Sequence, residues 1–74
     1  MIGVYYLWDG AEVIYVGSSR NVERRIARHK ATGLDFSGYF VDKRPRSRLR
    51  EFEAKAIAEF KPKLNASSVL TFEG

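Results

Sequence analysis

One glutamate in the predicted second helix stands where an apolar side chain is expected. On a helical wheel at about 100° per residue, Leu49, Ala56 and Phe60 form an apolar arc. Glu53 falls inside this arc. A carboxylate that faces a core is costly unless it is paired or binds a cation. Glu53 is therefore a candidate metal ligand, and a salt bridge to one of the many arginines is the alternative reading.

The predicted first helix contributes a pair of candidate polar side chains. Arg25 and His29 are four residues apart, so they lie on one helix face, at the margin of its apolar stripe. Arg24 and Arg28 point toward water on the same wheel. Arg25 and His29 could form part of a site, or they could be amphipathic side chains at the border of a helix.

The strands that must position these side chains follow from local patterns. Residues 2–8 and 12–17 are rich in aromatic and β-branched residues, which predicts two strands. Asp9-Gly10 between them is a turn signal, so the two strands form a hairpin. Residues 36–42 predict a third strand. Both faces of the hairpin carry apolar groups, so we expect helices on both faces.

Two helices complete the predicted domain. Asn21 is a suitable N-cap for a helix from Val22 to Thr32, and Gly33 can end it. A second helix is predicted over residues 47–60, and Pro62 stops it.

The predicted order of elements is β-β-α-β-α, with a tail at 66–74 that is ambiguous between a short helix and a strand. The sequence thus predicts a single domain over residues 1–74 in the α+β class. Its centre is a small three-stranded antiparallel sheet flanked by helices.

The amino-acid composition limits the kinds of binding partner and metal site that the chain can have. The 74 residues include 13 Lys and Arg against 9 Asp and Glu, a net charge of +4, which favours a polyanion such as nucleic acid. There is no cysteine, which excludes disulfides and thiolate metal sites, and a single histidine excludes most zinc sites. No signal-peptide pattern or membrane-length apolar run is found. We therefore expect a cytoplasmic protein that does not engage membranes.

Basic residues form two groups that could follow a phosphate backbone. The first group is Arg20, Arg24 and Arg28, and the second is Lys43, Arg44, Arg46, Arg48 and Arg50. Such contacts give affinity without sequence choice. Charge that serves only solubility is the alternative. Nothing in the chain resembles a base-reading module.

Five ordered segments together resemble one known family. Gly3-Val4-Tyr5 and Tyr15-Val16-Gly17 resemble the GIY-YIG pair that names a family of nucleases, with valine in place of isoleucine in both triplets. Ser18 and Asn21, then the run from Glu23 to His29, resemble the first helix of that family. Glu53 followed by Lys61-Pro62-Lys63-Leu64-Asn65 resembles its closing pattern. The resemblance covers residues 3–65.

The resemblance implies a metal-dependent DNA endonuclease with one divalent ion, Mg²⁺ or Mn²⁺, held by Glu53. The implied catalytic residues are Tyr5, Tyr15, Arg25, His29 and Glu53. Gly3, Gly17 and Asn65 would support the site. Tyr5 is our choice for the base that activates water, and Arg25 would stabilise the phosphate.

The hairpin register decides whether the two tyrosines can share a site. A two-residue turn at Asp9-Gly10 would set Tyr5 opposite Ile14 and put the tyrosines on different faces. A shared face requires a loop of three or five residues, or a bulge. We predict the longer loop, with Tyr5 opposite Tyr15.

Two other functions remain open at the level of sequence. The chain could be a non-catalytic nucleic-acid-binding module on the same scaffold, or a catalytic subunit active only within a larger repair or mobile-element assembly. A partner protein or a homodimer could supply specificity.

Overall fold

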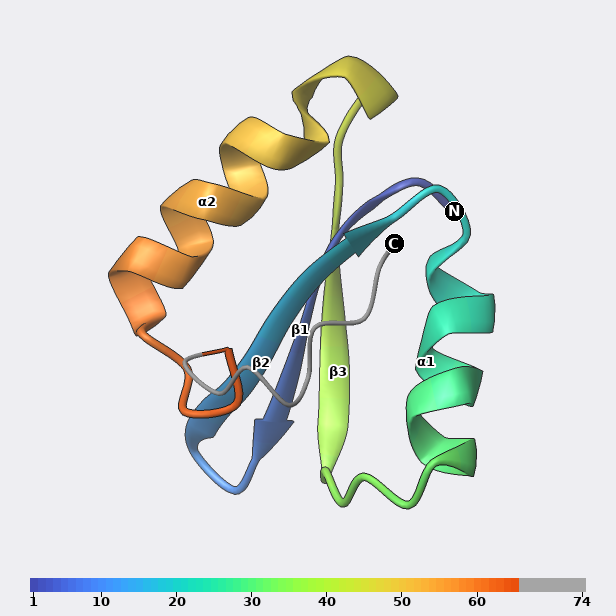
Figure 1. The fold of residues 1–74 in the computed structure, drawn as a ribbon, viewed down its shortest axis with the longest axis vertical. Coiled ribbons are helices and arrows are strands. Elements are labelled where there is room, and N and C mark those ends of the chain that lie inside the picture. The colour runs from blue at the N-terminus through green and yellow to red at the C-terminus, as the bar shows by residue number, and fades with distance from the viewer. Residues whose placement is uncertain (66–74) are drawn as a thin grey trace.

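The computed structural model describes residues 1–65, which form three strands and two α-helices in the predicted order (Figure 1). The α+β class is therefore confirmed. The ambiguous tail, 66–74, lies outside the described residues. The elements are β1 (Gly3–Asp9), β2 (Glu12–Ser19), α1 (Val22–Ala31), β3 (Gly38–Lys43), the 3₁₀ turn η1 (Arg46–Arg48) and α2 (Leu49–Phe60).

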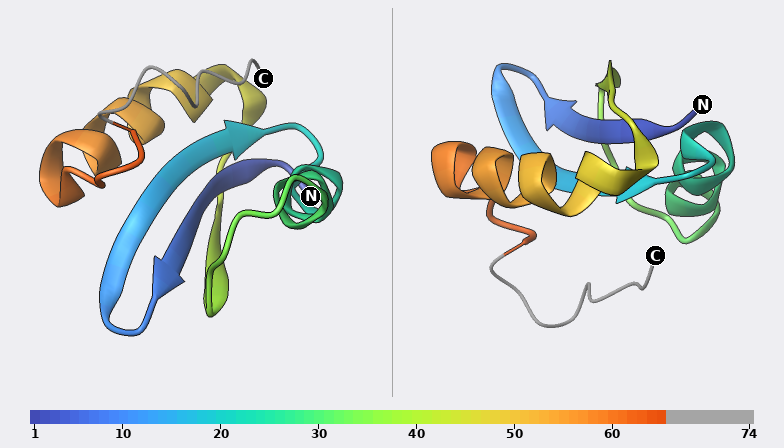
Figure 2. Two further views of the ribbon diagram at one scale, coloured as in Figure 1. Left: turned by 60° about the horizontal axis from the view of Figure 1, so that its bottom comes forward. Right: turned by 90° about the horizontal axis from the view of Figure 1, so that it is seen from above.

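The three strands form one antiparallel sheet in the order β2-β1-β3. The central strand β1 pairs with β2 from Gly3 to Asp9 and with β3 from Gly3 to Trp8. α1 and α2 flank the sheet (Figures 1 and 2). Among residues 1–65, we find no helix with the length and apolarity that crossing a membrane requires.

Each face of the sheet has its own apolar cluster, as the two-sided strand pattern predicts. On the α1 face, Tyr5 and Leu7 of β1 pack with Val22 and Ile26 of the helix. On the α2 face, the cluster is Val4, Val16, Leu49 and Ala56. Alternation along β1 sends successive side chains to opposite faces, so Tyr5 and Val4 belong to different clusters. This alternation fixes which face can carry a tyrosine site.

The predicted longer loop between β1 and β2 is wrong. Asp9 pairs with Glu12, so the loop is the two residues Gly10-Ala11, and Gly10 takes a positive φ of 64°. A β-bulge then follows, because Leu7 pairs with Tyr15 while Trp8 pairs with Val13. The extra residue, Ile14, changes the register by one.

The bulge places both tyrosines on the α1 face, as a shared site requires. Tyr5 pairs with Gly17 rather than with Tyr15, so the two tyrosines are diagonal neighbours. Ile14 and Tyr15 both join the α1-face cluster. The prediction of one shared face is thus confirmed, but a bulge rather than a long loop produces it.

The helices begin and end close to the predicted residues. The Asn21 side chain accepts a hydrogen bond from the Arg24 amide at 3.2 Å and caps α1. Gly33, with φ of 86°, follows the end of that helix. α2 ends at Phe60, where Lys61 adopts a left-handed conformation before Pro62.

One residue of the predicted apolar arc of α2 is not in the core. Phe60 is 45% exposed. It occupies the last position of α2, and its ring meets the edge of the Tyr6 ring at a centroid distance of 5.7 Å. The wheel places a side chain on a face, but it cannot tell how far along the helix the sheet continues.

Candidate active site

Tyr5, Tyr15 and His29 form a compact buried group between the sheet and α1. The Tyr5 hydroxyl lies 2.9 Å from Nε2 of His29, within hydrogen-bond distance. The His29 ring meets the Tyr15 ring nearly edge to face at 5.2 Å, and the two tyrosine rings are 6.2 Å apart. His29 is only 2% exposed, so it is not a border residue that reaches into solvent. Three predicted site residues therefore meet.

Burial raises the pKa of Tyr5 and lowers the pKa of His29, the two partners of this hydrogen bond. Burial, and then the neighbouring Tyr15, raise the pKa of Tyr5 well above its ordinary value, and the nearby Arg25 guanidinium offsets only part of that rise. Burial, and then the positive charges of Arg25 and Arg28, lower the pKa of His29. Both groups are therefore neutral at neutral pH. The Tyr5 hydroxyl can then donate to an unprotonated Nε2 of His29.

Gly17 makes room for the Tyr5 ring. Gly17 faces Tyr5 across the β1–β2 pair, and the ring lies over the Gly17 backbone. A Cβ at this position would lie 2.6 Å from Cζ and from the hydroxyl oxygen of Tyr5. The absence of a side chain therefore lets Tyr5 reach His29. This gives a physical reason for the last glycine of the second triplet.

Gly3 has a comparable role at the other strand pair. A Cβ at Gly3 would collide with the carbonyl oxygen of Asp42 on β3. Because that oxygen belongs to the backbone, the strands would have to move apart.

Asn65 closes the outer edge of β2 beside the tyrosines. Its side-chain oxygen accepts from the Val16 amide at 2.7 Å, and its side-chain nitrogen donates to the Val16 carbonyl at 2.9 Å. The amide thus takes the place of a neighbouring strand. The preceding Leu64 donates its amide to the Ile14 carbonyl at 3.1 Å. Both contacts bind the chain after α2 to the strand that carries Tyr15.

Glu53 of α2 is half-buried and accepts a hydrogen bond from Ser18 at the end of β2. Ser18 Oγ lies 2.7 Å from Oε1 of Glu53. Within residues 1–65, no arginine or lysine forms an ion pair with Glu53. The salt-bridge alternative is therefore not what the described residues show. The charge of Glu53 also contributes, less than the other causes, to the raised pKa of Tyr5.

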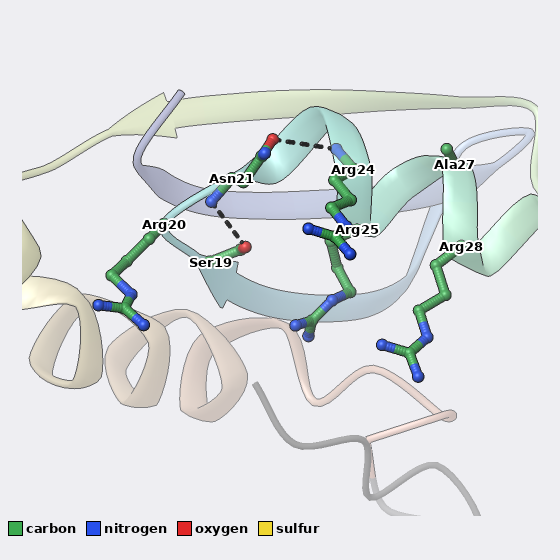
Figure 3. A pocket seen from close by; sticks show the side chains of 7 residues that line it. All are labelled: Ser19, Arg20, Asn21, Arg24, Arg25, Ala27 and Arg28. Carbon is green, nitrogen blue, oxygen red and sulfur yellow. Dashed lines mark hydrogen bonds between the residues drawn. The ribbon is translucent and has the colours of Figure 1, made fainter.

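Arginines line an open hollow of about 690 Å³ at the start of α1 (Figure 3). The Arg20 and Arg25 side chains extend in the direction of α2 (Figure 3). Arg24 and Arg28, which the wheel turned toward water, are both exposed. The residues that line this hollow are Ser19, Arg20, Asn21, Arg24, Arg25, Ala27 and Arg28.

A second open hollow, of about 570 Å³, lies between the end of β2 and the start of α2. Arg46, Arg50 and Arg20 line it together with Ser18. Ser19 and Arg20 belong to both hollows. The hollows therefore adjoin at the end of β2, beside the serine that bonds Glu53.

Two other predicted phosphate ligands lie elsewhere. The Arg44 guanidinium sits 3.9 Å from the centre of the Phe52 ring and donates to Asp42 at 3.0 Å, so α2 and β3 hold it in place. Lys43 is exposed at the end of β3 and lines neither hollow. The second basic group is thus divided. Arg46 and Arg50 line the second hollow, whereas Arg44 contacts Phe52 and Asp42.

The sequence identifies Ser18 only as part of the family pattern and indicates no role for it. The sequence feature that could have indicated its contact with Glu53 is its position directly after Tyr15-Val16-Gly17. Alternation from Val16 puts Ser18 on the α2 face, where Glu53 lies. The distance along the chain between the two residues hides their contact.

The donor set around Glu53 suits a hard cation that needs few protein ligands. Among the described residues, no group of three or more His, Asp or Glu side chains could hold a metal ion. Mg²⁺ is usually bound through one or two carboxylates and keeps several waters. One half-buried carboxylate beside arginines that can hold a phosphate therefore fits such an ion.

The family model described as the GIY-YIG catalytic domain matches residues 1–73 of the chain. Comparison with curated proteins and with solved structures finds no significant match. The match spans β1, β2, α1, β3 and α2.

Proposed function

Because the chain belongs to the GIY-YIG catalytic domain family, a family of nucleases, we propose that it is a DNA endonuclease that uses one divalent metal ion. The observation that carries this proposal is the buried hydrogen bond between Tyr5 of β1 and His29 of α1. Arg25 of the same helix lines the first hollow, and Glu53 of α2 accepts from Ser18, which lines the second. The two hollows adjoin at the end of β2, and arginines line both.

Glu53 would hold the metal ion, Mg²⁺ or Mn²⁺. When bound, such an ion neutralises charge on the phosphate and stabilises the leaving oxygen. Glu53 would supply a carboxylate oxygen to the ion, and its bond to Ser18 restrains the side chain. The proposal requires no other protein carboxylate.

Arg25 would pair with the non-bridging oxygens of the scissile phosphate. Its planar guanidinium can form two parallel hydrogen bonds, which a lysine cannot. Arg25 is half-buried and lines the first hollow. The exposed Arg20, Arg24 and Arg28 would hold neighbouring phosphates, and Arg46 would do so on the second hollow.

Tyr5 would take a proton from the attacking water and pass its own proton to His29. A tyrosine with a raised pKa rarely loses its proton outright, so direct use of a tyrosinate is unfavourable. Transfer along the 2.9 Å bond to His29 avoids that state. A phosphate paired with Arg25 and Arg28 would offset two positive charges that lower the pKa of His29. Substrate binding would thus make His29 a better acceptor.

This relay predicts the pH dependence of cleavage. His29 accepts a proton only when it is neutral, and its pKa lies below the ordinary 6.5 in the free protein. We expect the rate constant to be level through neutral pH and to fall as pH drops below about 6.5. His29→Gln should slow cleavage by about 100-fold and remove this acid limb. Single-turnover nicking across pH 5–8 measures both effects, and an unchanged acid limb in His29→Gln would contradict the relay.

Incubation of the purified chain with supercoiled plasmid tests the proposed activity. We expect open-circular product with Mg²⁺ or Mn²⁺ and none with a chelator. DNA retardation without nicking would support a non-catalytic binding module instead. Nicking that appears only when an added partner protein is present would support a catalytic subunit of a larger assembly.

A further inference from the structure

The hydrogen bond between Ser18 and Glu53 constrains how this carboxylate can bind a metal. An ionised carboxylate can only accept, so the Ser18 hydroxyl donates to Oε1 at 2.7 Å. The bond joins β2 to α2 across the sheet edge, between residues 35 apart in the chain. Both side chains are half-buried. The bond therefore restrains the Glu53 side chain beside Ser18, which lines the second hollow.

Oε2 is then the oxygen of Glu53 that is fully available to a metal ion. Across residues 1–65, the bond from Ser18 accounts for Oε1, and no other hydrogen bond or ion pair engages the carboxylate. Bidentate coordination would make Oε1 serve both the ion and the Ser18 hydroxyl, so each contact of Oε1 would be weaker. Coordination through Oε2 alone keeps the bond.

The number of carboxylate oxygens distinguishes the common hard cations. Mg²⁺ requires near-ideal octahedral geometry and keeps several waters, which suits one carboxylate oxygen. Ca²⁺ accepts six to eight oxygens in flexible geometry and is often bound by both oxygens of a carboxylate. A carboxylate restricted to one oxygen therefore favours the smaller ion.

We propose that Ser18 is a positioning residue that makes Glu53 a one-oxygen ligand and so sets a preference for Mg²⁺ over Ca²⁺. This inference rests on the proposed function, because it takes Glu53 as the metal ligand. The place of Ser18 supports it, since Ser18 lines the second hollow with Arg46 and Arg50, next to Ser19 and Arg20 shared by both hollows.

The test compares the affinity of the whole chain for Mg²⁺ alone and for Ca²⁺ alone by NMR titration of backbone amides near Glu53. In Ser18→Ala we expect a Mg²⁺ affinity about 10-fold lower and a Ca²⁺/Mg²⁺ affinity ratio higher than in the wild type. Ser18→Thr keeps the hydroxyl and should restore both values. Ser47→Ala, which removes a hydroxyl from the same hollow, should leave metal binding unchanged.

The possible failures separate the inference from the proposed function. Equal Mg²⁺ affinity and equal Ca²⁺/Mg²⁺ ratio in wild type and Ser18→Ala would overturn the role of Ser18 and leave Glu53 as the metal ligand. Shifts in the wild type that persist in Glu53→Gln would overturn the metal site itself, and the inference with it. The dispersion of each spectrum shows that the variant is folded, so a loss of binding cannot come from unfolding.

Discussion

Glu53→Gln is expected to slow metal-dependent nicking by about three orders of magnitude, because it removes the one carboxylate proposed to hold the ion. Glutamine has nearly the same shape, and its side-chain oxygen can still accept from Ser18. The fold and the β2–α2 contact should therefore survive. Loss of activity in this variant would reflect lost charge rather than lost structure. Single-turnover nicking of plasmid at saturating Mg²⁺ measures the effect.

Glu59→Gln provides the matched control for this experiment. Glu59 lies on the same helix, is exposed, and belongs to neither hollow. We expect nicking at the wild-type rate in this control and unchanged DNA retardation in both variants, since the arginines that line the hollows are intact. Cleavage by Glu53→Gln within a few-fold of the wild type would remove Glu53 from the proposed mechanism.

Much of this fold follows from local sequence rules because each rule acts within a few residues. Asn21 caps α1 through the Arg24 amide, and Gly33 follows the end of that helix in a positive-φ conformation, both as expected. The two-sided apolar pattern of residues 2–8 predicted one helix per face. The wheel of α2 singled out Glu53, and the structure brings it to the sheet edge beside Ser18.

The hairpin register could not be read in the same way. Asp9-Gly10 is a turn signal, yet the loop is Gly10-Ala11 and the register is then corrected by one residue at Ile14. No local pattern marks that bulge. It is favoured by contacts made elsewhere in the chain, since Ile14 and Tyr15 both pack in the α1-face cluster and the Ile14 carbonyl accepts from Leu64. A bulge decided by distant contacts has no signature within the hairpin.

The availability of the basic side chains for phosphate binding also depends on contacts that the local sequence does not show. Lys43, Arg44 and Arg46 are neighbours in sequence and formed one predicted basic group. In the fold, Arg44 turns to the Phe52 ring and Asp42, whereas Arg46 lines the second hollow. A charge run indicates a basic segment, but the tertiary partners decide which of its side chains are available to phosphates.

Gly17→Ala is expected to disable the site through a single methyl group. The added Cβ would lie 2.6 Å from the Tyr5 hydroxyl and from Cζ. Tyr5 is 1% exposed, so its ring cannot move outward without displacing the α1-face cluster. We expect the Tyr5–His29 bond to break and nicking to fall by about 100-fold, the order of loss expected for a misplacement of about 1 Å. Overpacking should also lower the free energy of unfolding by about 1–3 kcal/mol.

Gly38→Ala separates the effect on the site from the effect on stability. An added Cβ at Gly38 would press on an aromatic ring in the same way, that of Trp8, but on β3 and away from His29. We expect a similar loss of stability in both variants, measured by thermal denaturation, and a loss of nicking in Gly17→Ala alone. Activity that falls equally in both, in proportion to the unfolded fraction, would mean that Gly17 serves the fold and not the position of Tyr5. Wild-type nicking by a folded Gly17→Ala protein would show that the Tyr5–His29 bond is dispensable.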